Sequence, residues 1–111
     1  MRDLSLYLND IIGAIKSIQS FVAGMGYDAF KDDDKTVSAV IRKFEVIGEA
    51  VKQIPENLRE KYSSIPWKDI SGMRDRLIHF YFGVDAQLVW ATIHESLPEL
   101  NRVATKMLND L

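Results

Sequence analysis

Apolar residues recur at intervals of three and four along almost the whole chain, and this spacing constrains the fold more than any other feature of the sequence. It gathers the apolar side chains on one face of an α-helix. In the first segment, residues 4–22, they are Leu4, Leu8, Ile11, Ile12, Ile15, Ile18 and Val22. In the second, about 35–54, they are Val37, Val40, Ile41, Phe44, Ile47, Val51 and Ile54. Both segments are predicted to be amphipathic helices.

Capping residues and breakers delimit these two helices. Asp3 is predicted to cap the first, and Gly24 and Gly26 to end it. A short turn over residues 27–31 is expected to pack Phe30 inward. The aspartates at 32–34 favour the start of the second helix, because negative charge stabilises a helix N-terminus. They lack the spaced ligands and closing glutamate of a calcium loop.

Gly48 lies on the inward side of the second helix, where glycine costs about 1 kcal/mol relative to alanine. We therefore expect another helix to approach closely there. Pro55 is predicted to stop the helix, and a short turn over 57–62 to follow it.

A third helix is predicted to begin near Pro66 and to continue to Gly83. Asp85 is predicted to cap a fourth, which Pro98 should kink or split. Its apolar residues are Leu88, Val89, Ile93, Leu97, Leu100, Val103, Ala104 and Met107. The expected fold is all-α: an antiparallel four-helix bundle with short extra turns, in a single domain over residues 1–111.

Composition narrows the classes of function. With 111 residues, 47% of them hydrophobic and 27% charged, the chain has the balance of one globular domain. It contains no cysteine, which excludes disulfides and thiolate metal sites and suits the cytoplasm. We see no membrane span or signal peptide. A net charge of −2 argues against strong non-specific nucleic-acid binding, so contacts with RNA must be local or shared between subunits.

The candidate chemistry lies between Met73 and Asp85, where Arg74, His79 and Tyr81 fall within eight positions. An arginine can hold a phosphate, and a histidine can move protons near neutral pH. These two abilities are what RNA cleavage without a metal requires. The spacing alone also suits an ordinary solvated helix end.

Helical geometry relates these groups. Asp75 precedes His79 by four residues, so its carboxylate could orient the imidazole. Arg74 and His79 are about 140° apart around a helix, so one copy cannot easily close both around a single phosphate. Two copies that meet along this helix could, which favours a dimer with a composite cleft.

Other polar and aromatic residues are interpreted as structural. His94, beside Glu95, is expected to be a surface or boundary residue. Trp67 and Trp90 are more typical of core or interface anchors than of platforms for bases. No histidine and carboxylate cluster has ligand spacing, so no metal or other cofactor is expected.

The chain resembles the HepT-like (DUF86) branch of the HEPN superfamily nearly from end to end. Similar segments are Tyr7 to Ile11, the Phe30 turn, Ile47 to Ala50, Ile65 to Trp67, Met73 to Asp85 and Leu97 to Leu100. The family pattern of arginine, four residues, histidine, one residue and tyrosine is matched by Arg74, His79 and Tyr81. Phe80 stands where glycine is common, which adds bulk beside the site.

This resemblance implies a homodimeric ribonuclease toxin of a two-gene toxin–antitoxin system. Its antitoxin would be an MntA-type nucleotidyltransferase that transfers AMP to Tyr81. Catalysis would fall to Arg74 and His79, with Asp75 orienting His79. Arg76 would either add a phosphate contact or be solvated. Two alternatives stay open: a non-catalytic module that pairs with a nucleotidyltransferase, and a purely structural helical dimer or adaptor.

Overall fold

The structure, a computed structural model, describes residues 3–78 and 85–111, with the backbone alone for Arg74, Leu77 and Ile78. The described residues form helices and turns and include no strand, as the sequence predicts. In chain order the helices are α1 (Leu4–Phe21), α2 (Tyr27–Lys31), α3 (Asp34–Lys52), α4 (Glu56–Lys61), α5 (Trp67–Ser71), α6 (Met73–Ile78), α7 (Ala86–Glu95) and α8 (Leu97–Asn109).

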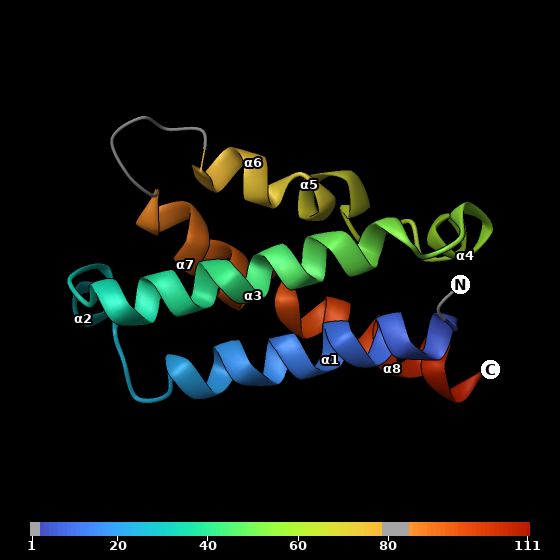
Figure 1. Cartoon of the computed structure of the whole chain (residues 1–111), viewed down its shortest axis with the longest axis horizontal. Coiled ribbons are helices and arrows are strands. Elements are labelled where there is room, and N and C mark those ends of the chain that lie inside the picture. Colours follow the sequence, from blue (N-terminus) through green and yellow to red (C-terminus); the bar gives the residue numbers. More distant parts are fainter. Residues whose placement is uncertain (1–2, 79–84) are drawn as a thin grey trace.

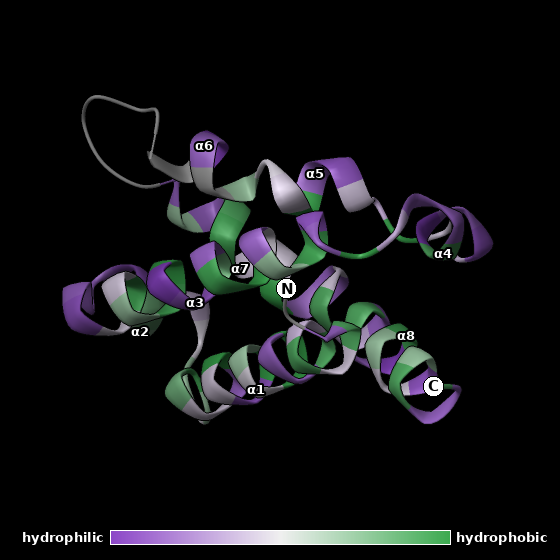
Figure 2. Ribbon diagram, turned by 45° about the vertical axis from the view of Figure 1, so that its right-hand side comes forward, coloured by the Kyte–Doolittle hydropathy of each residue, from purple (hydrophilic) through white to green (hydrophobic). Residues whose placement is uncertain are grey.

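Helix α3 lies at the centre of the bundle. It packs antiparallel to α1 on one side and against α5 and α6 on the other, while α8 packs on α1 (Figure 1). Helix α2 bridges α3 and α7. Apolar residues face the interior and polar residues the outside on each long helix (Figure 2). The largest fully buried side chains are Phe30, Phe44, Leu8, Ile11, Ile15, Ile18, Ile47, Ile54, Leu97, Leu100 and Val40.

Aspartates cap three of the helices, as predicted. The Asp3 carboxylate accepts a hydrogen bond from the Ser5 N–H at 3.2 Å, and the Asp33 carboxylate accepts one from the Thr36 N–H at 3.0 Å. The bond from the Thr36 N–H lowers the pKa of Asp33. The first helix ends at Phe21, and Gly24 in the following turn takes a φ of +78°, which glycine adopts without strain.

The predicted third helix is not continuous. It is interrupted at Gly72, where the backbone has a ψ of 0° and divides α5 from α6. The Lys68 carbonyl there accepts from both the Gly72 N–H and the Ser71 hydroxyl, each at 3.0 Å. A Cβ on Gly72 would lie only 3.2 Å from that carbonyl oxygen. Glycine therefore permits a tight turn that the apolar spacing does not predict. The predicted end at Gly83 lies outside the described residues.

The fourth predicted helix is split, as Pro98 suggested. Helix α7 ends at Glu95, and Pro98 lies in the first turn of α8, where its missing N–H costs no intrahelical hydrogen bond. The short turns are also found, as α2 with Phe30 fully buried and as α4.

The close approach expected at Gly48 is present. A Cβ at this position would meet the Ser71 carbonyl oxygen at 3.3 Å and the Ile70 carbonyl oxygen at 3.6 Å. The absence of a side chain therefore allows the backbone of α5 to rest directly on α3.

Gly48→Val is expected to destabilise the protein by about 1–3 kcal/mol, because the added methyl groups must displace backbone rather than a flexible side chain. The matched control is Gly13→Val in α1, where a Cβ would meet nothing within 4 Å. Urea unfolding of both variants measures the difference. Equal stabilities would contradict the close packing at Gly48.

Candidate functional site

Helix α6 carries the first part of the predicted motif. Its first residue, Met73, is buried at 4% exposure, and Asp75 and Arg76 are exposed. Arg74 follows Met73 in the same turn. His79 and Tyr81, together with Phe80, lie outside the described residues. The proximity of Arg74, Asp75, His79 and Tyr81 therefore stays a prediction.

The α5–α6 pair is held in the bundle by burial against α3 and by the hydrogen bonds of one tryptophan. Ile70 and Met73 are each 4% exposed. The Trp67 indole N–H donates to the carbonyl oxygens of Arg59 and Tyr62 at 3.0 and 3.1 Å. Trp67 is thus the structural anchor that the sequence predicted, and it ties α5 to the C-terminal end of α4.

Helix α7 begins on the other side of residues 79–84. The Asp85 carboxylate accepts from the Leu88 N–H at 3.1 Å, which confirms the predicted cap. On the inner face of α7, Val89 and Ile93 are buried, with exposed fractions of 0% and 4%. The motif is therefore flanked by two helices that are both fixed to the core.

Trp90 joins α7 to α2 through ring contacts. Its ring centroid lies 5.1 Å from that of Phe30 and 6.2 Å from that of Tyr27. This confirms the anchoring role expected of Trp90. The contact with Tyr27 was not predicted, because it joins residues far apart in the sequence.

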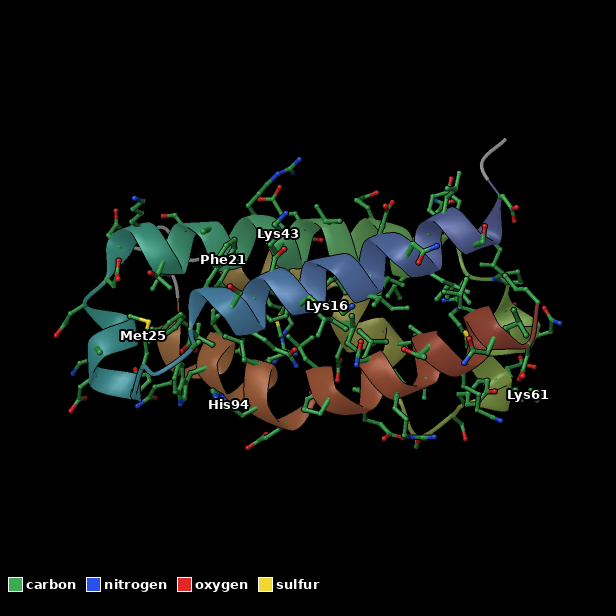
Figure 3. The ribbon with its side chains drawn as sticks, turned by 90° about the horizontal axis from the view of Figure 1, so that it is seen from below. Lys16, Phe21, Met25, Lys43, Lys61 and His94 are labelled. Atoms are coloured by element: carbon green, nitrogen blue, oxygen red, sulfur yellow. The ribbon has the colours of Figure 1, made fainter. Side chains whose placement is uncertain are left out.

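His94 is exposed on α7, as expected, at the α2 end of the bundle (Figure 3). Its Nδ1–H donates to the Trp90 carbonyl oxygen at 2.9 Å, and its ring lies 4.3 Å from the Trp90 ring, centroid to centroid. The spacing of four between Trp90 and His94 indicates that the two side chains can meet, but this pairing was not predicted.

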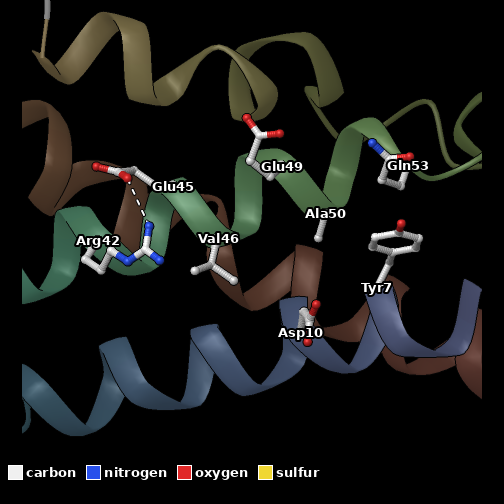
Figure 4. Close-up of a pocket in the computed structure, with 8 residues that line it drawn as sticks. All are labelled: Tyr7, Asp10, Arg42, Glu45, Val46, Glu49, Ala50 and Gln53. Carbon is white, nitrogen blue, oxygen red and sulfur yellow. Dashed lines mark hydrogen bonds and ion pairs between the residues drawn. The ribbon is translucent and has the colours of Figure 1, made fainter. Parts of the chain in front are cut away.

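A pocket of about 340 Å³ lies between α1 and α3 (Figure 4). Its ionisable lining includes three carboxylates, those of Asp10, Glu45 and Glu49, and one guanidinium, that of Arg42. Arg42 Nη1 is 3.2 Å from Glu45 Oε2. The carboxylates outnumber the cation, so this pocket does not favour an RNA phosphate.

Metal and membrane sites were also sought. Over the residues that the structure describes, no three histidine or acidic side chains gather as metal ligands. Within the same residues, no helix has the length and hydrophobicity needed to cross a bilayer.

The family model for ribonuclease HepT-like proteins matches residues 11–107. A putative RNase of Methanocaldococcus jannaschii is 46% identical over 110 residues, which cover 99% of this chain and 95% of that protein. A putative RNase of Caldanaerobacter subterraneus is 42% identical, over 92% of this chain and 91% of its own. A probable ribonuclease HepT of Thermococcus cleftensis is 46% identical, over 85% and 86%. No solved structure matches the chain significantly.

An all-α bundle in which this motif begins on α6 is a HEPN-like helical protein. The matched range covers nearly the whole bundle and all of the motif. The chain belongs to the ribonuclease HepT-like family.

Asp85→Ala is expected to lower the free energy of unfolding by about 1 kcal/mol, because the first turn of α7 loses its capping acceptor. Asp85→Ser, which keeps an acceptor at the cap, should retain most of the stability. Thermal or urea unfolding of the two variants separates these outcomes, and equal losses would show that the cap does not stabilise α7.

Proposed function

We propose that this protein is a metal-independent endoribonuclease, the toxin of a toxin–antitoxin pair, acting in the cytoplasm as a homodimer. Arg74 and His79 are its catalytic residues. The observation that carries the proposal is the family match over residues 11–107, a range that includes Arg74, His79 and Tyr81. The buried attachment of α6 beside Arg74 adds a fixed helix from which a phosphate-binding group can act.

A dimer resolves the geometric problem of the motif. If the helix continued regularly, Arg74 and His79 would lie about 140° apart. A second copy can instead supply His79 opposite the first copy's Arg74. Pairing also brings two sets of Arg74 and Arg76 to one cleft, which gives local positive charge to a chain whose net charge is −2. Arg76 is exposed and therefore accessible to a second phosphate.

In the reaction, His79 accepts the proton of the ribose 2′-hydroxyl as its oxygen bonds to phosphorus. The bond from phosphorus to the 5′-oxygen breaks, and this oxygen takes a proton from the His79 imidazolium or from water. The products are a 2′,3′-cyclic phosphate and a 5′-hydroxyl. Arg74 holds the phosphate and stabilises the charge that develops on it. Asp75 orients His79, and Tyr81 lines the cleft.

Tyr81 is the proposed control point. An MntA-type nucleotidyltransferase antitoxin would transfer AMP to its hydroxyl. The added nucleotide carries bulk and negative charge into the place where an RNA phosphate must dock. The modification would therefore stop cleavage without unfolding the bundle.

The runner-up is a non-catalytic helical module that partners a nucleotidyltransferase. The presence of both Arg74 and His79 favours the enzyme, since a binding module needs neither. A purely structural dimer would instead need Arg74 for assembly and would leave RNA intact.

The purified dimer is expected to cleave single-stranded RNA in the presence of EDTA. His79→Ala should reduce the rate by about 10²- to 10⁴-fold, since a general acid–base group is lost. Arg74→Ala should reduce it by about 10²- to 10³-fold, through loss of charge stabilisation. Gel analysis of end-labelled RNA measures both rates.

Lys106→Ala, an exposed change on α8, is the matched control and should cleave normally. Full activity in the Arg74 and His79 variants would refute the site. Inactive wild-type protein that still binds a nucleotidyltransferase would favour the non-catalytic module.

Co-expression with a cognate nucleotidyltransferase is expected to raise the intact mass of the protein by whole AMP units and to abolish cleavage. Tyr81→Phe should keep the unmodified mass, because it lacks the acceptor hydroxyl. Tyr62→Phe, which keeps Tyr81, is the control and should still be modified. Modification that persists in Tyr81→Phe would exclude Tyr81 as the acceptor.

A further inference from the structure

A second pocket, of about 350 Å³, lies on the outer face of α7 beside α2. This volume is at the lower end of the range of about 300–1,000 Å³ found for small-molecule sites. Its lining residues are Tyr27, Gln87, Trp90, Ala91, His94 and Glu95. All but Tyr27 follow one helical face, at spacings of three, four, seven and eight from Gln87.

The two tryptophans differ in how their indole N–H groups are used. Trp67 is 9% exposed, and its N–H donates to two carbonyl oxygens. Trp90 is only half-buried, and its N–H donates to none of the described residues. Trp67 therefore has a structural role, whereas Trp90, which also packs on Phe30 and His94, keeps part of its surface at the lining of the pocket.

The pocket combines aromatic walls with polar edges. Ala91 lines the pocket with a small side chain, and the His94 ring lies against the Trp90 ring, with 4.3 Å between the ring centroids. Gln87 offers an amide that can both donate and accept, and Glu95 offers a carboxylate acceptor. His94 uses Nδ1–H on the Trp90 carbonyl, which leaves Nε2 for a further hydrogen bond.

We propose that this pocket binds one unpaired base of the RNA substrate, a step that rests on the proposed ribonuclease function. A base needs an aromatic surface for stacking and donors and acceptors for its edge, and the pocket has both. Stacking is also a suitable source of affinity for a chain of net charge −2, because it does not depend on a basic surface.

The position of the pocket connects it to the motif. Gln87 follows Asp85, the cap of α7, by two residues. Residues 79–84 alone separate α6 from that cap. The seven steps from Ile78 to Asp85 span at most about 25 Å, which limits how far the start of α7 can lie from the end of α6. In the proposed ribonuclease, a base bound here would select the register at which the RNA is cut.

The experiment uses the full chain and a single-stranded tetranucleotide with 2′-O-methyl groups, which lacks the attacking hydroxyl and stays intact. The protein has two tryptophans and therefore two indole N–H signals in a ¹⁵N–¹H NMR spectrum. Titration should shift the Trp90 signal and leave the Trp67 signal as an internal control. Trp90→Phe assigns the two signals.

Ala91→Leu fills the pocket without removing an aromatic ring, and it should weaken binding of the tetranucleotide by about tenfold, the scale of one lost stacking contact. Ala91→Ser keeps the pocket and should bind like the wild type. Unchanged unfolding midpoints show that the fold is intact in both variants.

The inference is overturned if the Trp90 signal does not respond to the tetranucleotide, if it responds only to a protein partner, or if Ala91→Leu binds as tightly as Ala91→Ser. These outcomes are separate from the proposed catalysis. RNA cleavage with no response at Trp90 would contradict the base site alone. Binding at Trp90 without cleavage of natural RNA would contradict the nuclease alone.

Discussion

The backbone contact between α3 and α5 at Gly48 is the constraint on which the position of the motif depends. Helix α3 already buries its apolar residues against α1. It can accept a further helix pair closely only where a side chain is missing. At Gly48 the Ser71 carbonyl comes within 3.3 Å of the place a Cβ would occupy, and α6 follows two residues later. Helix α6, on which the motif begins, therefore starts at a fixed place beside the central helix α3.

The two helices that flank the motif have different means of attachment. Helix α6 has only six residues, too few to be stable without tertiary packing. It relies on the burial of Met73 and on α5, which Trp67 secures. Helix α7 is longer and has its own cap at Asp85 and a buried face. The described ends of the proposed motif, Met73 on α6 and Asp85 at the start of α7, are thus both attached to the core.

Local chemistry explains which parts of the fold could be predicted. The caps at Asp3, Asp33 and Asp85, and the split at Pro98, follow from hydrogen bonds within four residues. The interruption at Gly72 was missed because apolar spacing runs through it without a change of phase. The contact between Tyr27 and Trp90 was missed because it depends on how α2 and α7 pack together.

For the candidate site, the sequence predicts which residues take part but not how their side chains are arranged. The sequence predicts roles for an arginine, a histidine and a tyrosine in phosphate binding, proton transfer and modification, and helical geometry predicts that the first two side chains diverge. In the proposed dimer, the place where these side chains meet would depend on the second subunit, which the periodicity of one chain does not define. The pocket at Trp90 has the same character, since it needs Tyr27 from α2 and the small side chain of Ala91 on α7.

The most direct test of the composite site is a mixing experiment with the inactive variants Arg74→Ala and His79→Ala. The two are unfolded together, refolded at equal amounts and assayed on RNA. If Arg74 and His79 act across the dimer, each heterodimer regains one intact site, and random pairing should restore about a quarter of the wild-type activity. A mixture that stays as inactive as either variant alone, although heterodimers form, would contradict the account.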